Sequence, residues 1–148
     1  MHYNLGLTYF KLEHYSLAVE HLTKCTKLNP VHKFAFNNLA FIYNMHEYYS
    51  ETIAICSKAE LNIIEHQQKI DTFKNGGSKK LDEVKLPFAD DGGDMVKHNC
   101  NRHWAFALYK KEQMANAIKK IQRAVVIDAS DAENWIVWAL IMRRVGNY

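Results

Sequence analysis

The chain has 148 residues, of which 48% are hydrophobic and 24% are charged, and its formal net charge is +3. This is the length of one domain, and the apolar fraction excludes a chain that is disordered throughout. Glycine and proline are scarce, with six and two residues, which argues against a collagen-like sequence and against a turn-rich β-sandwich.

The sequence favours a protein of a reducing compartment. The longest apolar run, residues 136–142, is far shorter than the roughly 18 residues of a membrane span. No charged segment followed by an apolar stretch stands at Met1, so we expect no secretory signal. The three cysteines, Cys25, Cys56 and Cys100, are odd in number and far apart. They indicate free thiols in the cytoplasm rather than a disulfide framework.

Apolar residues recur at steps of three and four, as in Leu5, Tyr9 and Leu12, which is the period of amphipathic helices. The interruption at residues 75–93 holds four of the six glycines and one proline. In chain order, the pattern predicts helices over Tyr3–Lys11, Tyr15–Leu28, Lys33–Met45, Ser50–Phe73, Met95–Lys110, Met114–Ile127 and Ala132–Val145.

The chain also repeats itself at an offset of 34 residues. Leu5 and Tyr9 align with Leu39 and Tyr43, and after the interruption Trp104 and Ala105 align with Trp138 and Ala139. A period of this length indicates an array of stacked repeats.

The repeated pattern resembles the tetratricopeptide repeat (TPR), whose signature runs W-x2-L-G-x2-Y, then A-x3-F, then P. The first copy reads His2-x2-Leu5-Gly6-x2-Tyr9, then Ala18-x3-Leu22, then Pro30. Further copies begin with Phe36-x2-Leu39-Ala40-x2-Tyr43, with Asn101-x2-Trp104-Ala105-x2-Leu108 and with Trp135-x2-Trp138-Ala139-x2-Met142.

The resemblance implies one all-α domain, a TPR-type α-solenoid that winds antiparallel helix pairs into a right-handed superhelix. About three and a half repeats would occupy residues 1–32, 33–66, 98–131 and 132–148. Residues 67–97 would be an insertion of extended helices, which pair with each other, around a flexible Gly-rich loop at 75–93. Asp94 would cap the helix that begins at Met95.

Neither end of the chain reads as the polar capping unit with which repeat arrays finish. We therefore expect a piece of a longer solenoid, or another chain that covers the last repeat. Without such cover, Trp135, Trp138 and Ile141 would be only half covered.

The sequence does not predict a catalytic or metal site. His98, Cys100 and His103 form the tightest group of metal-ligand types, but no fourth ligand is near and no CxxC pair occurs. The acidic run at 90–94 lacks the alternating oxygen ligands and the distal glutamate of a calcium loop. Because no phosphate loop, nucleophile elbow or paired carboxylates are found either, we expect a non-catalytic protein without cofactor or metal.

The resemblance further implies that the first helix of each pair lines a concave groove, in which an extended peptide or a helix of a partner protein binds. The groove residues would be Tyr3, Leu7, Phe10, Phe34, Asn37, Phe41, Asn44, Arg102, Phe106, Tyr109, Ile136, Leu140 and Arg143. The aromatic members would anchor the partner. The alternative is that these side chains pack on opposite helices of a tight superhelix.

TPR domains that bind the acidic C-terminal tails of chaperones hold the terminal carboxylate with lysine, asparagine and arginine. Here Tyr3, Leu7, Asn99 and His103 stand at four of those positions, and only Asn38 matches. The sequence therefore argues against chaperone-tail binding.

We expect a protein-interaction scaffold of a larger multiprotein assembly, for which the resemblance allows ciliary or cytoskeleton-associated complexes among others. Two alternatives stay open. One is an accessory domain of an enzyme whose catalytic part lies outside the chain. The other is a repeat that binds RNA or an acidic partner, through the basic residues Arg102, Lys110, Lys111, Lys119, Lys120, Arg123, Arg143 and Arg144.

Overall fold

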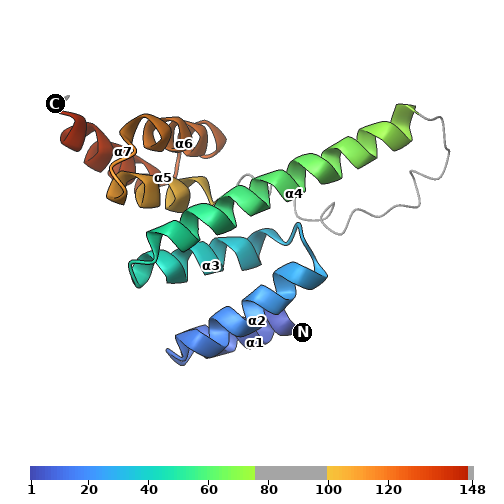
Figure 1. Ribbon diagram of the computed structural model, residues 1–148. Helices are drawn as coiled ribbons and strands as arrows, with labels where there is room; N and C mark the ends of the chain where they lie inside the picture. The colour runs from blue at the N-terminus through green and yellow to red at the C-terminus, as the bar shows by residue number, and fades with distance from the viewer. Residues whose placement is uncertain (76–99, 147–148) are drawn as a thin grey trace.

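The computed structural model describes residues 1–75 and 100–146, which form seven α-helices and no strand. The helices are α1 (His2–Lys11), α2 (Tyr15–Leu28), α3 (Lys33–Met45), α4 (Tyr49–Asn75), α5 (Asn101–Lys110), α6 (Met114–Ile127) and α7 (Ala132–Val145). Figure 1 shows them as successive antiparallel hairpins, α1–α2, α3–α4 and α5–α6, followed by α7. The predicted all-α fold is confirmed.

The hairpins stack in chain order. The second helix of each hairpin packs against the first helix of the next, as in α2–α3, α4–α5 and α6–α7, and the first helices α3, α5 and α7 also pack side by side. None of the described helices combines the length and the apolarity that crossing a bilayer would require.

The helix bounds agree closely with the sequence pattern. Helices α2, α3, α6 and α7 have the predicted ends, whereas α1 begins one residue earlier and α4 is extended at both ends. Helix α5 begins at Asn101, and Cys100, which the prediction placed inside this helix, lies in a turn. Of the predicted insertion at 67–97, the structure describes the part up to residue 75, where α4 projects past the other helices (Figure 1). The predicted loop, the Asp94 cap, the acidic run, His98 and the pairing of the flanking helices lie outside the described residues.

Close contact between the two helices of a hairpin depends on one small residue of the repeat. A Cβ atom on Gly6 would lie 2.7 Å from Cγ of Leu22. Ala40 and Ala105 hold the same position in the next hairpins, and both are fully buried. The small residue lets the two backbones approach, so that the facing side chain of the second helix fills the space between them.

The burial of the residue before this small residue depends on how the hairpins stack. Leu39 and Trp104 are buried in the two core clusters, together with residues of the preceding hairpin. Leu5 is 39% exposed, because no described helix packs on the outer side of α1 as α2 packs on α3. Equivalent residues are therefore buried only where a preceding hairpin covers them.

The turns that follow the first helices also share one backbone conformation. Glu13, Glu47 and Glu112 have φ of 61°, 65° and 62°, and Gly146 at the equivalent position after α7 has φ of 86°. The N–H of the following residue bonds back to the helix, as from Tyr48 N to Tyr43 O at 2.7 Å. This is a Schellman motif, which ends a helix with one residue in the left-handed region. Three of the four turns place a glutamate where glycine is favoured.

We expect Gly6→Leu to destabilise the fold by about 1–3 kcal/mol, since the added side chain meets the buried Leu22. Urea unfolding followed by circular dichroism measures this. Asn4→Leu adds the same side chain at an exposed position of the same helix and should change the free energy of unfolding little. An unchanged stability of Gly6→Leu would contradict the close approach of α1 and α2.

We expect Glu47→Gly to stabilise the protein by up to about 1 kcal/mol, because glycine adopts a positive φ without steric cost. Glu51→Gly makes the same exchange inside α4 and should destabilise by a similar amount, because glycine is unfavourable within a helix. Thermal unfolding of the two variants and of the parent shows whether each exchange raises or lowers stability. If both variants lose stability, the left-handed turn at Glu47 is wrong.

Candidate partner-binding groove

A groove of about 480 Å³ runs over the first helices of the second, third and fourth repeats. Its lining residues come from α3, α5 and α7, and most of them are apolar. They are Phe41, Asn44, Met45, Arg102, His103, Phe106, Glu133, Ile136, Val137 and Leu140. Phe41 is 42% exposed and Ile136 is 59% exposed, so large apolar surfaces face solvent here.

Six of the residues predicted for the groove line it together: Phe41, Asn44, Arg102, Phe106, Ile136 and Leu140. The sequence analysis missed four others, Met45, His103, Glu133 and Val137. A signal for two of them was present: Met45 follows Phe41 by four residues and His103 precedes Phe106 by three, which places each pair on one helix face.

The remaining predicted residues do not line this groove. Tyr3 packs on His32 and Phe34, with ring centroids 4.7 and 6.1 Å apart. Leu7 and Asn37 are half-buried. Tyr3 of α1 thus forms a separate aromatic group with the start of α3.

Two predicted aromatic residues border the groove. Phe10 of α1 meets Phe41 edge-on at 5.8 Å, and so connects the first hairpin with the groove. Tyr109 packs beside Phe106 at 6.1 Å, with Lys110 near both rings. Arg143 is exposed near the end of α7.

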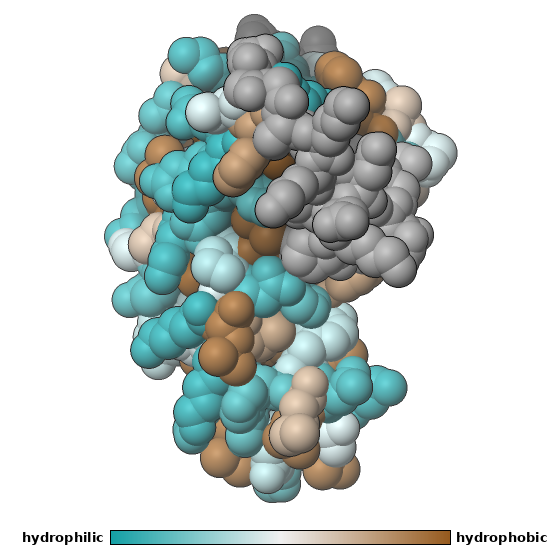
Figure 2. Space-filling view, turned by 90° about the vertical axis from the view of Figure 1, so that its right-hand side faces the viewer, coloured by the Kyte–Doolittle hydropathy of each residue, from teal (hydrophilic) through white to brown (hydrophobic). Residues whose placement is uncertain are grey.

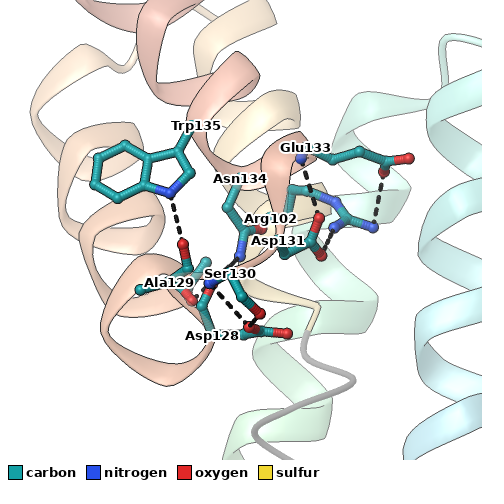
Figure 3. A network of polar contacts seen from close by, with 9 residues as sticks. Arg102, Asp128, Ala129, Ser130, Asp131, Glu133, Asn134 and Trp135 are labelled. Carbon is teal, nitrogen blue, oxygen red and sulfur yellow. Dashed lines mark hydrogen bonds and ion pairs between the residues drawn. The ribbon is translucent and has the colours of Figure 1, made fainter.

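A polar network holds α7 against α5 at the groove edge (Figure 3). The guanidinium of Arg102 forms ion pairs with Asp131 at 2.6 Å and with Glu133 at 3.2 Å. Asp131 also caps α7, because its Oδ1 accepts a hydrogen bond from the backbone N–H of Glu133 at 3.0 Å. The charge of Arg102 is therefore largely balanced by these two carboxylates, and the groove wall has a fixed geometry.

His103 lies below the groove and is buried. Burial, aided by the positive charge of Arg102 and opposed by Asp131, lowers the pKa of the His103 imidazole from 6.5 to about 4. Its backbone carbonyl accepts a hydrogen bond from Nδ2 of Asn44 at 2.9 Å. Near neutral pH the ring is uncharged and serves as packing between α3 and α5, 5.8 Å from the ring of Phe41.

A second hollow, of about 790 Å³, lies between α2 and α3, where the first two hairpins meet. The sequence analysis did not predict it. It mixes charged, polar and aromatic side chains, and its lining includes Glu13, His14, Tyr15, Tyr43 and His46.

Two of the three cysteines pack in the core clusters. Cys25 and Cys56 are buried, and burial raises the pKa of both thiols. Cys56 donates a hydrogen bond to the backbone carbonyl of Cys100 at 3.6 Å. No group of three metal-ligating side chains occurs within the described residues, and His98 is not among these.

Comparison with protein families bears directly on these hairpins. The model of the tetratricopeptide repeat matches residues 1–32, which comprise α1, α2 and their turn. Residues 1–32 therefore form a tetratricopeptide repeat. The later hairpins repeat the geometry of the first one, so the whole described fold is a TPR-type helical repeat. Among curated proteins, no match to the chain was found. TPR repeats generally mediate protein–protein interactions and are typically non-catalytic.

The low pKa of His103 predicts acid sensitivity. Between pH 6.5 and 4 the unfolded chain binds a proton that the folded TPR domain excludes, so stability falls as the pH falls through this window. At pH 4.5 the parent should lose about 2 kcal/mol more, relative to pH 7, than His103→Gln.

Urea unfolding at both pH values tests this prediction. His14→Gln, which removes an exposed imidazole, should retain the acid sensitivity of the parent. An equal loss of stability in His103→Gln and in the parent would contradict the burial of a neutral ring.

Proposed function

We propose that this TPR domain is a non-catalytic scaffold that binds a peptide or helix of a partner protein in the α3–α5–α7 groove, within a larger multiprotein assembly. The observation that carries the proposal is the row of solvent-exposed apolar side chains in that groove, among them Phe41, Ile136 and Leu140. An exposed apolar strip with a polar edge is typical of an interaction surface.

The groove has features that favour binding. Fully burying an apolar side chain contributes roughly 1.5–3 kcal/mol, so a few anchors from a partner could supply most of its affinity. The ion pairs of Arg102 with Asp131 and Glu133 hold α5 and α7 in place before a partner arrives. A preformed groove avoids part of the ordering cost of association.

Other surfaces support the choice of this groove. On the face seen in Figure 2, hydrophobic residues are scattered among hydrophilic ones and form no long apolar strip in its coloured part. Ion pairing weakens the alternative that the basic residues bind RNA or an acidic partner. Glu60 pairs with both Lys120 and Arg123, and Glu112 pairs with Arg144. Binding to a phosphate backbone needs a contiguous stripe of available cations.

The proposed setting is the reducing cytoplasm, because the buried thiols of Cys25 and Cys56 are free. A ciliary or cytoskeleton-associated assembly is one setting that suits such a scaffold. The role of an enzyme's accessory domain would require a catalytic part outside this chain.

Peptides selected from a phage-displayed random library against the parent protein test the proposal. Phe41→Glu and Ile136→Glu should each weaken the binding of the selected peptides at least tenfold, because a carboxylate in the groove would be desolvated by the peptide. Isothermal titration calorimetry measures the affinities.

Val126→Glu is the matched control, since Val126 is 85% exposed on α6 and does not line the groove. This variant should bind the peptides as the parent does. Salt should change the affinity little, whereas an electrostatic surface would lose affinity steeply. Peptides that bind all three variants equally would place the interaction elsewhere and contradict the proposal.

A further inference from the structure

The α2–α3 hollow, of about 790 Å³, is formed between the turns of the first two hairpins. One wall comes from the turn after α1 and the start of α2, with Glu13 and Tyr15. The other comes from the end of α3 and the turn that follows it, with Tyr43, His46 and Tyr48. Figure 1 shows both turns on the same side of the array. A hollow of this size can hold a segment of a peptide with its side chain.

Aromatic rings make up much of the wall of the α2–α3 hollow. Tyr15, Tyr43 and Tyr48 line it, and Tyr48 is 57% exposed. The ring of Tyr15 is held from two sides, with its centroid 5.9 Å from that of Phe10 and 4.8 Å from that of His46, both in edge-to-face contact. The face of a phenol ring carries partial negative charge and attracts cations.

The carboxylates at the hollow have the sign that a cation requires. Glu13 lines the hollow, and no lysine or arginine is among the described residues that line it. Burial, together with the negative charge of Glu51, raises the pKa of the Tyr43 phenol, so the Glu51 carboxylate acts on this wall as well. Within residues 1–75 and 100–146, neither Glu13 nor Glu51 forms an ion pair.

The next junction between hairpins lacks this combination of residues. In the third repeat, Leu108 stands where the second repeat has Tyr43, and Lys111 stands where it has His46. Leucine offers no ring face, and the ammonium group of lysine repels a cation. The chemistry of the α2–α3 hollow is therefore particular to this junction and does not follow from the repeat in general.

Helix α3 separates the α2–α3 hollow from the groove. Tyr43 and His46 line the hollow, whereas Phe41, Asn44 and Met45 line the groove. None of the described lining residues belongs to both. The two surfaces can therefore be altered one at a time.

The lining selects among ligand classes. An anion would be repelled by Glu13 and Glu51. A metal ion lacks ligands, because no group of three metal-ligating side chains occurs in the part of the chain that the structure describes. A guanidinium group fits best, since its planar face stacks on aromatic rings while its N–H groups donate to carboxylates, and since it is more weakly hydrated than an ammonium group.

We propose that the α2–α3 hollow binds an arginine side chain of a partner peptide, with its guanidinium group against the tyrosine rings and paired with the carboxylate of Glu13. The charge of Glu51 adds to the attraction. This site is separate from the groove of the proposed function and would recognise a charged side chain, whereas the groove offers apolar surface.

The probe is a pentapeptide with arginine at its centre and alanine elsewhere, capped at both ends. A matched peptide carries citrulline, which keeps the shape of the arginine side chain without its charge. Titration of the ¹⁵N-labelled full chain, followed by NMR, measures the affinity and locates the site. We expect the arginine peptide to shift amide signals of residues 13–19 and 42–48 and to bind at least fivefold more tightly than the citrulline peptide. A lysine peptide should bind several-fold more weakly than the arginine peptide.

Variants of the hollow test the two kinds of contact separately. Glu13→Gln should weaken binding of the arginine peptide at least fivefold. Glu112→Gln makes the same exchange at the equivalent turn of the third hairpin, outside the hollow, and should bind as the parent does. Tyr48→Leu should weaken binding several-fold, whereas Tyr48→Phe, which keeps the ring face, should retain it. Glu13 and Tyr48 are exposed, so circular dichroism should show these variants folded.

Ile136→Glu, which damages the proposed groove, should bind the arginine peptide as the parent does, so that the two proposals fail independently. Equal affinity for the arginine and citrulline peptides would overturn this proposal, and so would equal affinity of the parent and Glu13→Gln. Absence of binding, or amide shifts confined to residues of the groove, would overturn it as well.

Discussion

The architecture depends on the close approach of two helices at one small residue of each repeat. Gly6, Ala40 and Ala105 let the second helix of the hairpin come near enough for its own apolar residue to fill the space between the backbones. The contact buries surface that neither helix could bury alone. Because the next hairpin then packs on this one, the same local contact, repeated in each hairpin, produces the array.

The same geometry creates the candidate groove. Each first helix has one side against its own hairpin partner, one side against the neighbouring hairpins, and one side free. The free sides of α3, α5 and α7 together form the groove. The groove therefore follows from the stacking of the helices rather than from a dedicated loop or insertion.

The turns show how strongly the repeat constrains the chain. Glu13, Glu47 and Glu112 adopt a left-handed backbone that glycine would adopt at no steric cost. The Schellman hydrogen bonds and the packing of the flanking helices outweigh this local strain. The turn conformation is thus set by the hairpin, and the residue at this position is free to vary between Glu and Gly146.

The sequence by itself determined the helices and the repeat interval, because the helical period is a local property that residue spacing records. It also predicted Phe41, Phe106, Ile136 and Leu140 as members of one surface. Only the tertiary structure decided that Tyr3 and Phe34 form a separate group, that Leu5 is exposed while Leu39 is buried, and that His103 is an uncharged core residue. The exposure of a side chain, its place in the groove and its pKa depend on which helices lie beside it. The spacing of residues along one helix does not reveal these neighbours.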